Sequence, residues 1–204
     1  MIESGADALL AKPLSAARVL ERVGILIRQR KPFVVTSDYI GPDRRKEAKR
    51  KGDYPMLEVP NSLKVKAMGQ KEEMEAIQRA IDEAIADVNL RKLERHAAQI
   101  ALLVDKIVPA LERGVVDEPV QKFLKRLLYV AEDSSRRMVG TKYDHVSELC
   151  QSLIKVTVNI RAAGGSPESK DVRLLNPLSQ AIQAGFGTGT AAAARDISVS
   201  VGTK

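Results

Sequence analysis

The chain has 204 residues, of which 44% are hydrophobic and 29% are charged, and its formal net charge is +7 at pH 7. This hydrophobic fraction can build a core, so the composition excludes wholesale disorder. The sequence contains no apolar window long enough for a membrane span, and an acidic N-terminus is not expected of a secretion signal. A single cysteine excludes an internal disulfide, and with only two histidines it excludes a zinc finger, so a reducing cytoplasm is the expected location.

Residues 1–31 predict a strand, a turn and an amphipathic helix. The apolar run Ala8–Ala11 ends at Lys12-Pro13, where proline removes a backbone donor and keeps Lys12 extended, so a strand of about five residues is expected to end there. Ser15 is expected to cap a helix that continues to about Arg30. The apolar residues of this helix recur three and four positions apart: Val19, Leu20, Val23, Leu26 and Ile27.

Residues 32–70 are expected to form an extended, basic connector with at most one short turn. Several prolines and glycines in this stretch exclude a long helix. Residues 1–70 hold 14 basic and 8 acidic side chains (14 − 8 = +6), so most of the positive charge belongs to the first third of the chain. Six basic residues lie close together in this connector: Arg44, Arg45, Lys46, Lys49, Arg50 and Lys51.

Residues 71–186 show apolar stripes with a helical period of about 3.6 residues. The first predicted helix covers 71–112, where Pro109 should kink or end it near Val108 and Gly114 should stop it. The second is expected to start at Asp117 with Pro119 in its first turn, and to end near 139–140.

A third helix is predicted over about 142–163, closed by Gly164-Gly165. A fourth is predicted to start at Ser166-Pro167 and to bend or restart at Asn176-Pro177. Short joints between amphipathic helices favour antiparallel packing, which buries every stripe. The expected fold class is therefore mainly α: an antiparallel bundle of about four helices, preceded by the strand–helix element and the extended connector, and followed by a mobile tail over 187–204.

A composite pattern in residues 1–31 carries the most specific signal. Gly5-Ala6-Asp7 is followed, after four residues, by Lys12-Pro13 and then by a helix rich in leucine and valine. This pattern resembles the C-terminal end of the receiver domain of two-component response regulators, namely the end of the fourth helix, the fifth strand and the fifth helix. The resemblance implies that Lys12 contacts the phosphoryl group on a distant aspartate, and that the peptide bond before Pro13 is cis.

The other active residues of a receiver domain would all lie before Met1. The resemblance therefore implies that this chain is the C-terminal part of a longer protein, without the phosphorylated aspartate and without the acidic residues that bind Mg²⁺. We accordingly expect no metal or other cofactor in this chain. In the intact protein, phosphorylation would change the face formed by the fifth strand and helix, and the bundle would report this change to a protein partner.

Two interpretations of the basic residues stay open. The segment 42–51 is either a solvated linker or an arm that contacts nucleic acid, an anionic surface or an acidic partner. The alternative function that follows is a nucleic-acid-associated protein binding through residues 42–51. The second predicted helix also carries basic residues, but acids lie between them and favour a solvated face.

The remaining residues predict no catalytic centre. His96 is expected to be an exposed helix residue, because its neighbours lack the lysine and glycine that follow the histidine of phosphotransfer modules. His145 is expected at the surface, and Cys150 is expected to be buried and inert. No acid, base and nucleophile can be assembled, so we predict neither an enzyme nor a small-molecule substrate. Self-association as a homodimer is expected, because the apolar faces are rich and the strand–helix element lacks neighbours.

Overall fold

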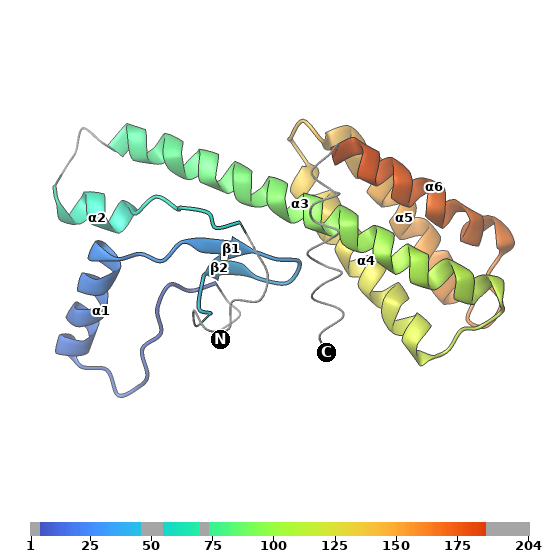
Figure 1. Ribbon diagram of the computed structural model, residues 1–204, viewed down its shortest axis with the longest axis horizontal. Coiled ribbons are helices and arrows are strands. Elements are labelled where there is room, and N and C mark those ends of the chain that lie inside the picture. The colour runs from blue at the N-terminus through green and yellow to red at the C-terminus, as the bar shows by residue number, and fades with distance from the viewer. Residues whose placement is uncertain (1–4, 46–54, 70–73, 187–204) are drawn as a thin grey trace. The chain divides into compact units, whose positions relative to one another are not determined.

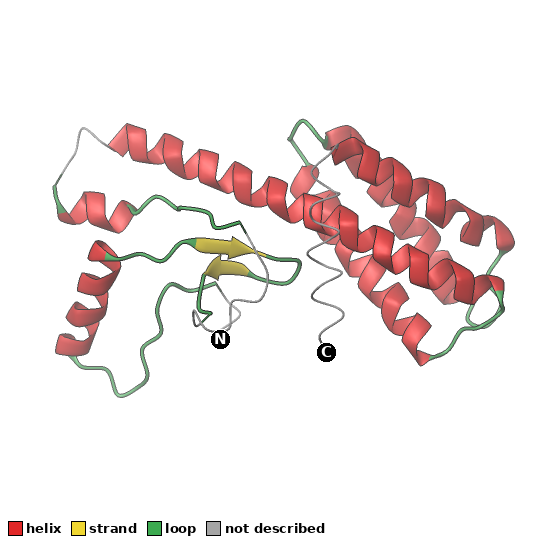
Figure 2. Ribbon diagram, in the orientation of Figure 1, coloured by secondary structure: helices red, strands yellow, loops and turns green. Residues whose placement is uncertain are grey.

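The computed structural model describes residues 5–45, 55–69 and 74–186 (Figure 1). These residues form six helices and a two-stranded sheet (Figure 2). The chain divides into two compact units, residues 1–92 and 93–204, and the division falls inside the longest helix. The sequence predicts boundaries near residues 31 and 70, and none at this position.

The first unit combines short elements with the N-terminal half of a long helix. Its sheet is a hairpin in which Val34 pairs with Gly41 in antiparallel register. Phe33 also forms a bridge to Leu57, which brings the chain after the hairpin back beside it. The elements are α1 (Ala16–Arg28), β1 (Phe33–Val35), β2 (Ile40–Pro42), α2 (Ser62–Ala67) and the start of α3 (Met74–Glu112).

Helix α1 confirms the helix predicted after Ser15. The Ser15 hydroxyl caps it by accepting from the Arg18 backbone N–H at 3.4 Å. The Lys12–Pro13 peptide bond is cis, the geometry that the resemblance implies. The strand predicted before Lys12 is wrong, because residues 8–12 have no regular structure. A strand needs a neighbour to satisfy its backbone groups, and no described segment pairs with this run.

The extended connector predicted over 32–70 is also wrong in part, because it contains the hairpin and α2. The β-branched pair Val34 and Val35 is buried, and burial of these side chains favours a strand over an open linker. A four-residue turn joins the strands: the Thr36 N–H donates to the Tyr39 carbonyl at 2.8 Å, and the Thr36 hydroxyl accepts from the Tyr39 N–H at 2.9 Å.

The second unit is a helical bundle built from the C-terminal part of α3 and from three further helices, α4 (Glu118–Met138), α5 (Asp144–Ala162) and α6 (Ser169–Phe186). Short connections reverse the chain between successive helices, as predicted (Figure 1). Asp117 caps α4 by accepting from the Val120 N–H at 3.0 Å, with Pro119 in the first turn. Gly114 follows the end of α3 and has φ +72°, a backbone conformation that cannot continue the helix.

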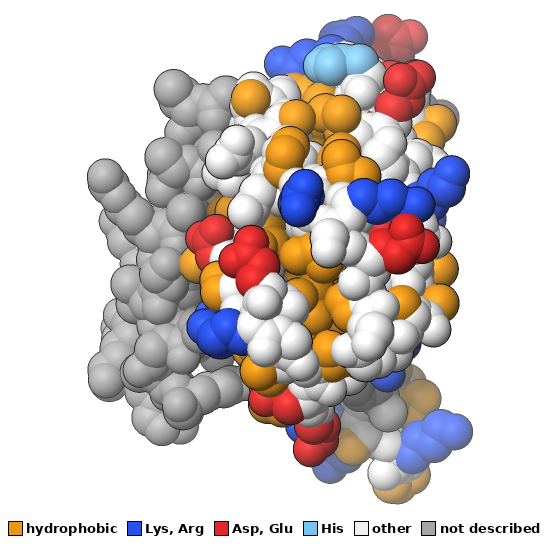
Figure 3. Space-filling view, turned by 90° about the vertical axis from the view of Figure 1, so that its right-hand side faces the viewer, with side chains coloured by type: hydrophobic (Ala, Val, Ile, Leu, Met, Phe, Trp, Pro, Cys, Tyr) orange, Lys and Arg blue, Asp and Glu red, His pale blue; other side chains and the backbone are white. Residues whose placement is uncertain are grey.

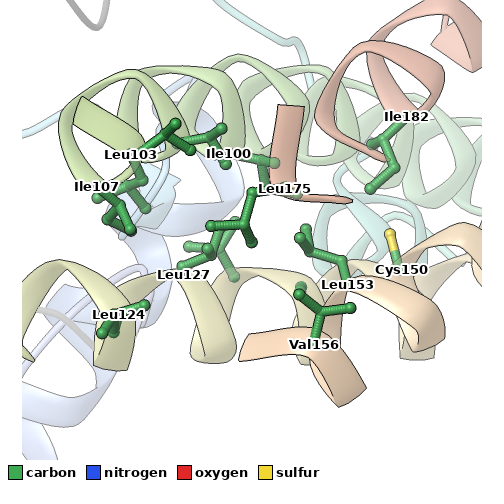
Figure 4. Close-up of a cluster of buried hydrophobic side chains, with 14 of the residues drawn as sticks. Ile100, Leu103, Ile107, Leu124, Leu127, Cys150, Leu153, Val156, Leu175 and Ile182 are labelled. Carbon is green, nitrogen blue, oxygen red and sulfur yellow. The ribbon is translucent and has the colours of Figure 1, made fainter. Parts of the chain in front are cut away.

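The bundle core is formed by aliphatic side chains from all four helices, which point toward one another in Figure 4. Each of the labelled residues is fully or nearly fully buried. They are Ile100, Leu103 and Ile107 of α3, Leu124 and Leu127 of α4, Cys150, Leu153 and Val156 of α5, and Leu175 and Ile182 of α6. The predicted helical bundle is therefore confirmed for these helices.

Two prolines interrupt the helices less than predicted. Helix α3 continues past Pro109 to Glu112, and α6 is one helix from Ser169 through Pro177 to Phe186. Both prolines lie on exposed faces, where water can satisfy the carbonyl group that proline leaves without a donor. Buried neighbours such as Leu111 and Leu175 hold the opposite faces in the core, so packing outweighs the local cost.

Among the helices that the structure describes, none is both long enough and apolar enough to cross a bilayer.

Candidate functional site

The residues that the resemblance assigns to phosphoryl contact, Lys12 and Pro13, lie at an exposed bend just before α1. Within the described chain, no hydrogen bond or ion pair engages the Lys12 side chain. An ammonium group in such a position can reach an anion outside this chain, but nothing here orients it. Arg44 and Arg45, the other site residues that the structure describes, contact Ala6 and Asp43.

The apolar stripe of α1 is only partly covered, because Val23, Leu26 and Ile27 are half-buried whereas Val19 and Leu20 are exposed. No residue of this helix is buried, and the exposed fraction of Leu20 is 70%. Leu14, just before the helix, is 56% exposed. Helix α1 contacts α2, and the Asn61 side-chain amide donates to the Leu26 carbonyl at 2.8 Å. This helix is therefore amphipathic, and the exposed part of its stripe, at Val19 and Leu20, has no covering partner among the described residues of the first unit.

The Gly5-Ala6-Asp7 motif fastens the N-terminal segment to the hairpin and to α1. Gly5 has φ +73°, and a Cβ atom there would lie 2.5 Å from the Ile40 carbonyl oxygen, so only glycine fits. The Ala6 carbonyl accepts from the Arg44 guanidinium, which fixes the next residue to the chain after β2.

Asp7 completes this attachment through Arg30. Both carboxylate oxygens of Asp7 accept from the Arg30 guanidinium, at 2.9 and 3.1 Å. Arg30 also donates to the Pro60 carbonyl at 2.6 Å, and its guanidinium lies 5.1 Å from the centre of the Phe33 ring. A bidentate pair of this kind fixes both side chains in one orientation. Sequence reasoning singled out Asp7 but missed Arg30, because no local pattern joins residues so far apart.

The first two basic residues of the predicted contact arm have structural contacts. Arg44 donates to Ala6, and Arg45 donates to the Asp43 carboxylate at 3.0 and 3.3 Å. Asp43 is buried, so its charge needs this pairing. The other four predicted contact residues lie outside the described residues: Lys46, Lys49, Arg50 and Lys51.

A buried lysine on α3 holds the hairpin turn, and sequence reasoning missed it. The Lys92 side chain is buried, and its ammonium donates to the Thr36 and Ser37 carbonyls at 2.9 and 2.5 Å. Lys92 therefore ties the turn of the hairpin to the last part of α3 that belongs to the first unit. Lysine is rarely this buried unless it is paired, so the contact contributes to the position of the hairpin.

The prediction that His96 is exposed is wrong, because its side chain is fully buried in the bundle. Its Nδ1 atom lies 3.2 Å from the Ser134 hydroxyl and 3.6 Å from an oxygen of Asp133. Serine and aspartate approach the same ring nitrogen, so the group does not have the relay geometry of a catalytic triad. Burial also removes the access that a phosphorylated histidine needs.

The sequence also predicts an exposed His145 and a buried Cys150, and the structure confirms both. His145 is exposed at the start of α5. Cys150 is fully buried, and burial raises the pKa of its thiol to about 12. A thiol with this pKa is almost entirely protonated at neutral pH, so Cys150 is not a reactive nucleophile in the folded protein.

Three basic residues of α4 pair with acids on the same helix, as expected from the acids that lie between them in the sequence. Arg137 and Arg136 reach Asp133 at 2.8 and 3.5 Å, and Lys122 reaches Glu118 at 2.8 Å. The face of the bundle drawn in Figure 3 carries basic and acidic side chains interspersed rather than a field of one sign. Such a face gives little attraction for a polyanion.

The resemblance places the acidic residues that bind Mg²⁺ before Met1, so it predicts no magnesium site among the residues that the structure describes. In the described ranges, no group of three or more histidine, cysteine, aspartate or glutamate side chains is placed to hold a metal ion. Asp7, the acid of the N-terminal motif, is engaged by Arg30.

Comparison with known proteins gives no relationship for this chain. No protein-family model matches it, and neither a curated protein nor a solved structure shows significant similarity to it.

Proposed function

We propose that this chain is the C-terminal part of a two-component response regulator that transmits a signal and catalyses no reaction itself. The proposal is supported by the order of Gly5-Ala6-Asp7, Lys12-Pro13 and an amphipathic helix, which α1 provides at the expected residues. In this scheme the helical bundle is the output or interaction module, its partner is another protein, and the protein works in the reducing cytoplasm.

The observation that carries the proposal is the partly uncovered apolar stripe of α1, exposed at Val19 and Leu20. Burying one leucine or valine side chain stabilises a protein by about 1.5–3 kcal/mol, so a stable domain rarely leaves such a stripe in water. Leu20 is 70% exposed, and no residue of α1 is buried. In an α/β domain, a helix with this pattern packs against a sheet. We infer that the sheet of an intact receiver domain covers this stripe.

The most direct experiment is to read the genomic DNA upstream of the first codon and to express the joined protein. We expect an α/β segment that carries an acidic pair and a phosphoacceptor aspartate. Incubation with acetyl phosphate and Mg²⁺ should then add one phosphoryl group, detected by intact-protein mass spectrometry. Lys12→Met should leave much of the phosphorylation intact but weaken the conformational response, measured by hydrogen exchange in α1.

Lys66→Met is the matched control, because Lys66 is an exposed lysine on α2. It should respond to acetyl phosphate like the unchanged protein. An upstream sequence without such a segment, or a joined protein that acetyl phosphate does not modify, would overturn the proposal.

The proposal includes self-association of the isolated chain as a homodimer, because two copies can cover each other's apolar stripes. Light scattering over a concentration series tests this. A dimer that dissociates in Leu20→Glu is the expected result, whereas a strict monomer at high concentration contradicts it.

The alternative, a nucleic-acid-associated protein, is favoured by the net charge of residues 1–70 alone. Its test is retardation of labelled duplex DNA or RNA, which should weaken steeply as salt is raised. Lys49→Ala, Arg50→Ala and Lys51→Ala should be combined, because changing Arg44 or Arg45 would also break the contacts to Ala6 and Asp43. No retardation at low salt would discard this alternative.

A further inference from the structure

The first unit contains a cleft that is lined by apolar and basic residues, and Lys12 is not one of them. The cleft has a volume of about 290 Å³ and lies between the N-terminal segment, one face of α1 and the chain after β2. Leu9, Leu26 and Pro42 contribute to its apolar lining. Three basic residues from different parts of the chain line it: Arg22, Lys31 and Arg44.

The cleft and the apolar stripe of α1 share one residue. Arg22, Ile25 and Gln29 line only the cleft, Leu20, Val23 and Ile27 belong only to the stripe, and Leu26 belongs to both. At 3.6 residues per turn, the centres of the two faces are roughly a third of a turn apart. A sheet that covers the stripe would therefore meet the cleft at Leu26 and leave Arg22 and Gln29 outside the stripe.

The cleft carries an excess of positive charge. Asp7 is its acidic residue, and both oxygens of Asp7 are occupied by Arg30. Arg22 and Lys31 are exposed and form no ion pair in the described chain. Arg44 adds a third cation, held in place by its bond to the Ala6 carbonyl. The cleft thus offers cations beside apolar side chains, which complement a ligand that has carboxylates beside aliphatic groups.

Two other kinds of ligand fit the cleft less well. Its volume is at the lower end of the roughly 300–1,000 Å³ range of small-molecule pockets, and exposed lining residues such as Leu9 and Arg22 leave much of a small ligand in water. Single-stranded nucleic acid would need aromatic side chains on which its bases stack, and no aromatic residue lines the cleft.

We propose that this cleft binds an acidic peptide segment of a partner protein, in which leucine-like side chains contact Leu9 and Leu26 while carboxylates pair with Arg22 and Lys31. The inference goes beyond the proposed function and does not depend on phosphorylation, because the cleft is formed within residues 7–44.

Fluorescence anisotropy tests the proposal with the full chain. The probe is a fluorescein-labelled peptide of about two heptads, with glutamate and leucine in an amphipathic helical pattern. We expect saturable binding that weakens as salt is raised. The double variant Arg22→Gln with Lys31→Gln should lower the affinity at least about tenfold, because two charge-assisted hydrogen bonds are lost.

The matched control removes the same charge elsewhere in the first unit, through Arg28→Gln with Lys66→Gln. Its affinity should change less than about threefold, because only long-range attraction is reduced. Leu9→Ser should also weaken peptide binding. Circular dichroism of each variant verifies that the helices are retained.

Three results would overturn the proposal. They are no binding of the glutamate–leucine peptide at low salt, an equal loss of affinity in the control variant, and tighter binding of a uridine oligonucleotide with the same number of charges. If the oligonucleotide binds more tightly and Leu9→Ser leaves its affinity unchanged, the basic residues of the cleft bind nucleic acid instead of an acidic peptide. Peptide binding without any response to acetyl phosphate in the joined protein would keep this inference while removing the proposed function.

Discussion

Helices α1 and α5 have similar apolar patterns and very different surroundings. Both carry valine, leucine or isoleucine at helical spacing, yet Leu153 of α5 is fully buried and Leu20 of α1 is 70% exposed. Among the described valine, leucine and isoleucine residues of the first unit, only Val34 and Val35 are buried. The bundle, in contrast, has one continuous core from four helices. An apolar stripe thus shows that a helix requires a partner, and it does not show that the partner is in the same chain.

The two units also differ in how polar groups support them. The first unit relies on specific long-range polar contacts, such as Asp7 with Arg30 and Lys92 with the hairpin turn. The bundle relies on aliphatic packing and includes a small buried polar group around His96. We therefore expect single polar substitutions to disturb mainly the local structure of the first unit, and aliphatic truncations to lower mainly the stability of the bundle.

The largest expected effect comes from truncating the same residue type in the two units. Leu153→Ala should lower the free energy of unfolding by about 2–5 kcal/mol, because it leaves a cavity in a fully buried site. Leu20→Ala should change it by less than about 0.5 kcal/mol, because its side chain is already exposed. Urea denaturation followed by circular dichroism measures both. Equal losses would show that the α1 stripe is covered in solution.

The next effect concerns the buried histidine. His96→Ala should cost about 1–3 kcal/mol, because it removes a partner of Ser134 and Asp133 inside the bundle. His145→Ala, at an exposed site, should stay within about 0.5 kcal/mol. The same urea titration compares the two variants. A neutral His96→Ala would mean that the buried polar group contributes nothing to stability.

A smaller and more local effect is expected at the hairpin. Lys92→Met keeps the aliphatic stem but removes the ammonium that binds the Thr36 and Ser37 carbonyls. Loss of about 1 kcal/mol of local stability should make hairpin amides exchange roughly five- to tenfold faster. Hydrogen-exchange mass spectrometry should detect this in residues 33–42 while the bundle stays protected. Lys66→Met, on exposed α2, is the control and should leave the hairpin unchanged.

The last prediction concerns the thiol of Cys150, whose titration leaves the stability at neutral pH unchanged. Its raised pKa of about 12 predicts very slow labelling by a thiol reagent at pH 8, whereas an added Leu20→Cys should react at once. The folded thiol holds its proton more tightly than the unfolded one, so the contribution of Cys150 is complete below pH 9 and is lost as the pH rises toward 12. Rapid labelling of Cys150 in the native protein would contradict its burial.

The local sequence was enough to predict the helices and several of their ends. Ser15 and Asp117 cap α1 and α4 because their side chains accept from N–H groups within the same turn, and Gly114 takes a positive φ at the end of α3. These features depend on residues three or four positions apart. The pattern of apolar residues likewise predicted the bundle, because a helical period identifies the face that must be buried.

Only the tertiary structure decided which helix faces are buried and which charged side chains are paired. The surroundings of His96 in the sequence are those of an exposed helix residue, yet Ser134 and Asp133 of α4 enclose it. The run before Lys12 has a strand-like sequence, but no segment that the structure describes pairs with it, whereas Val34 and Val35 pair with β2. Burial, pairing and the anchoring of Asp7 by Arg30 depend on segments brought together by folding, and their free energy comes from contacts that no local pattern encodes.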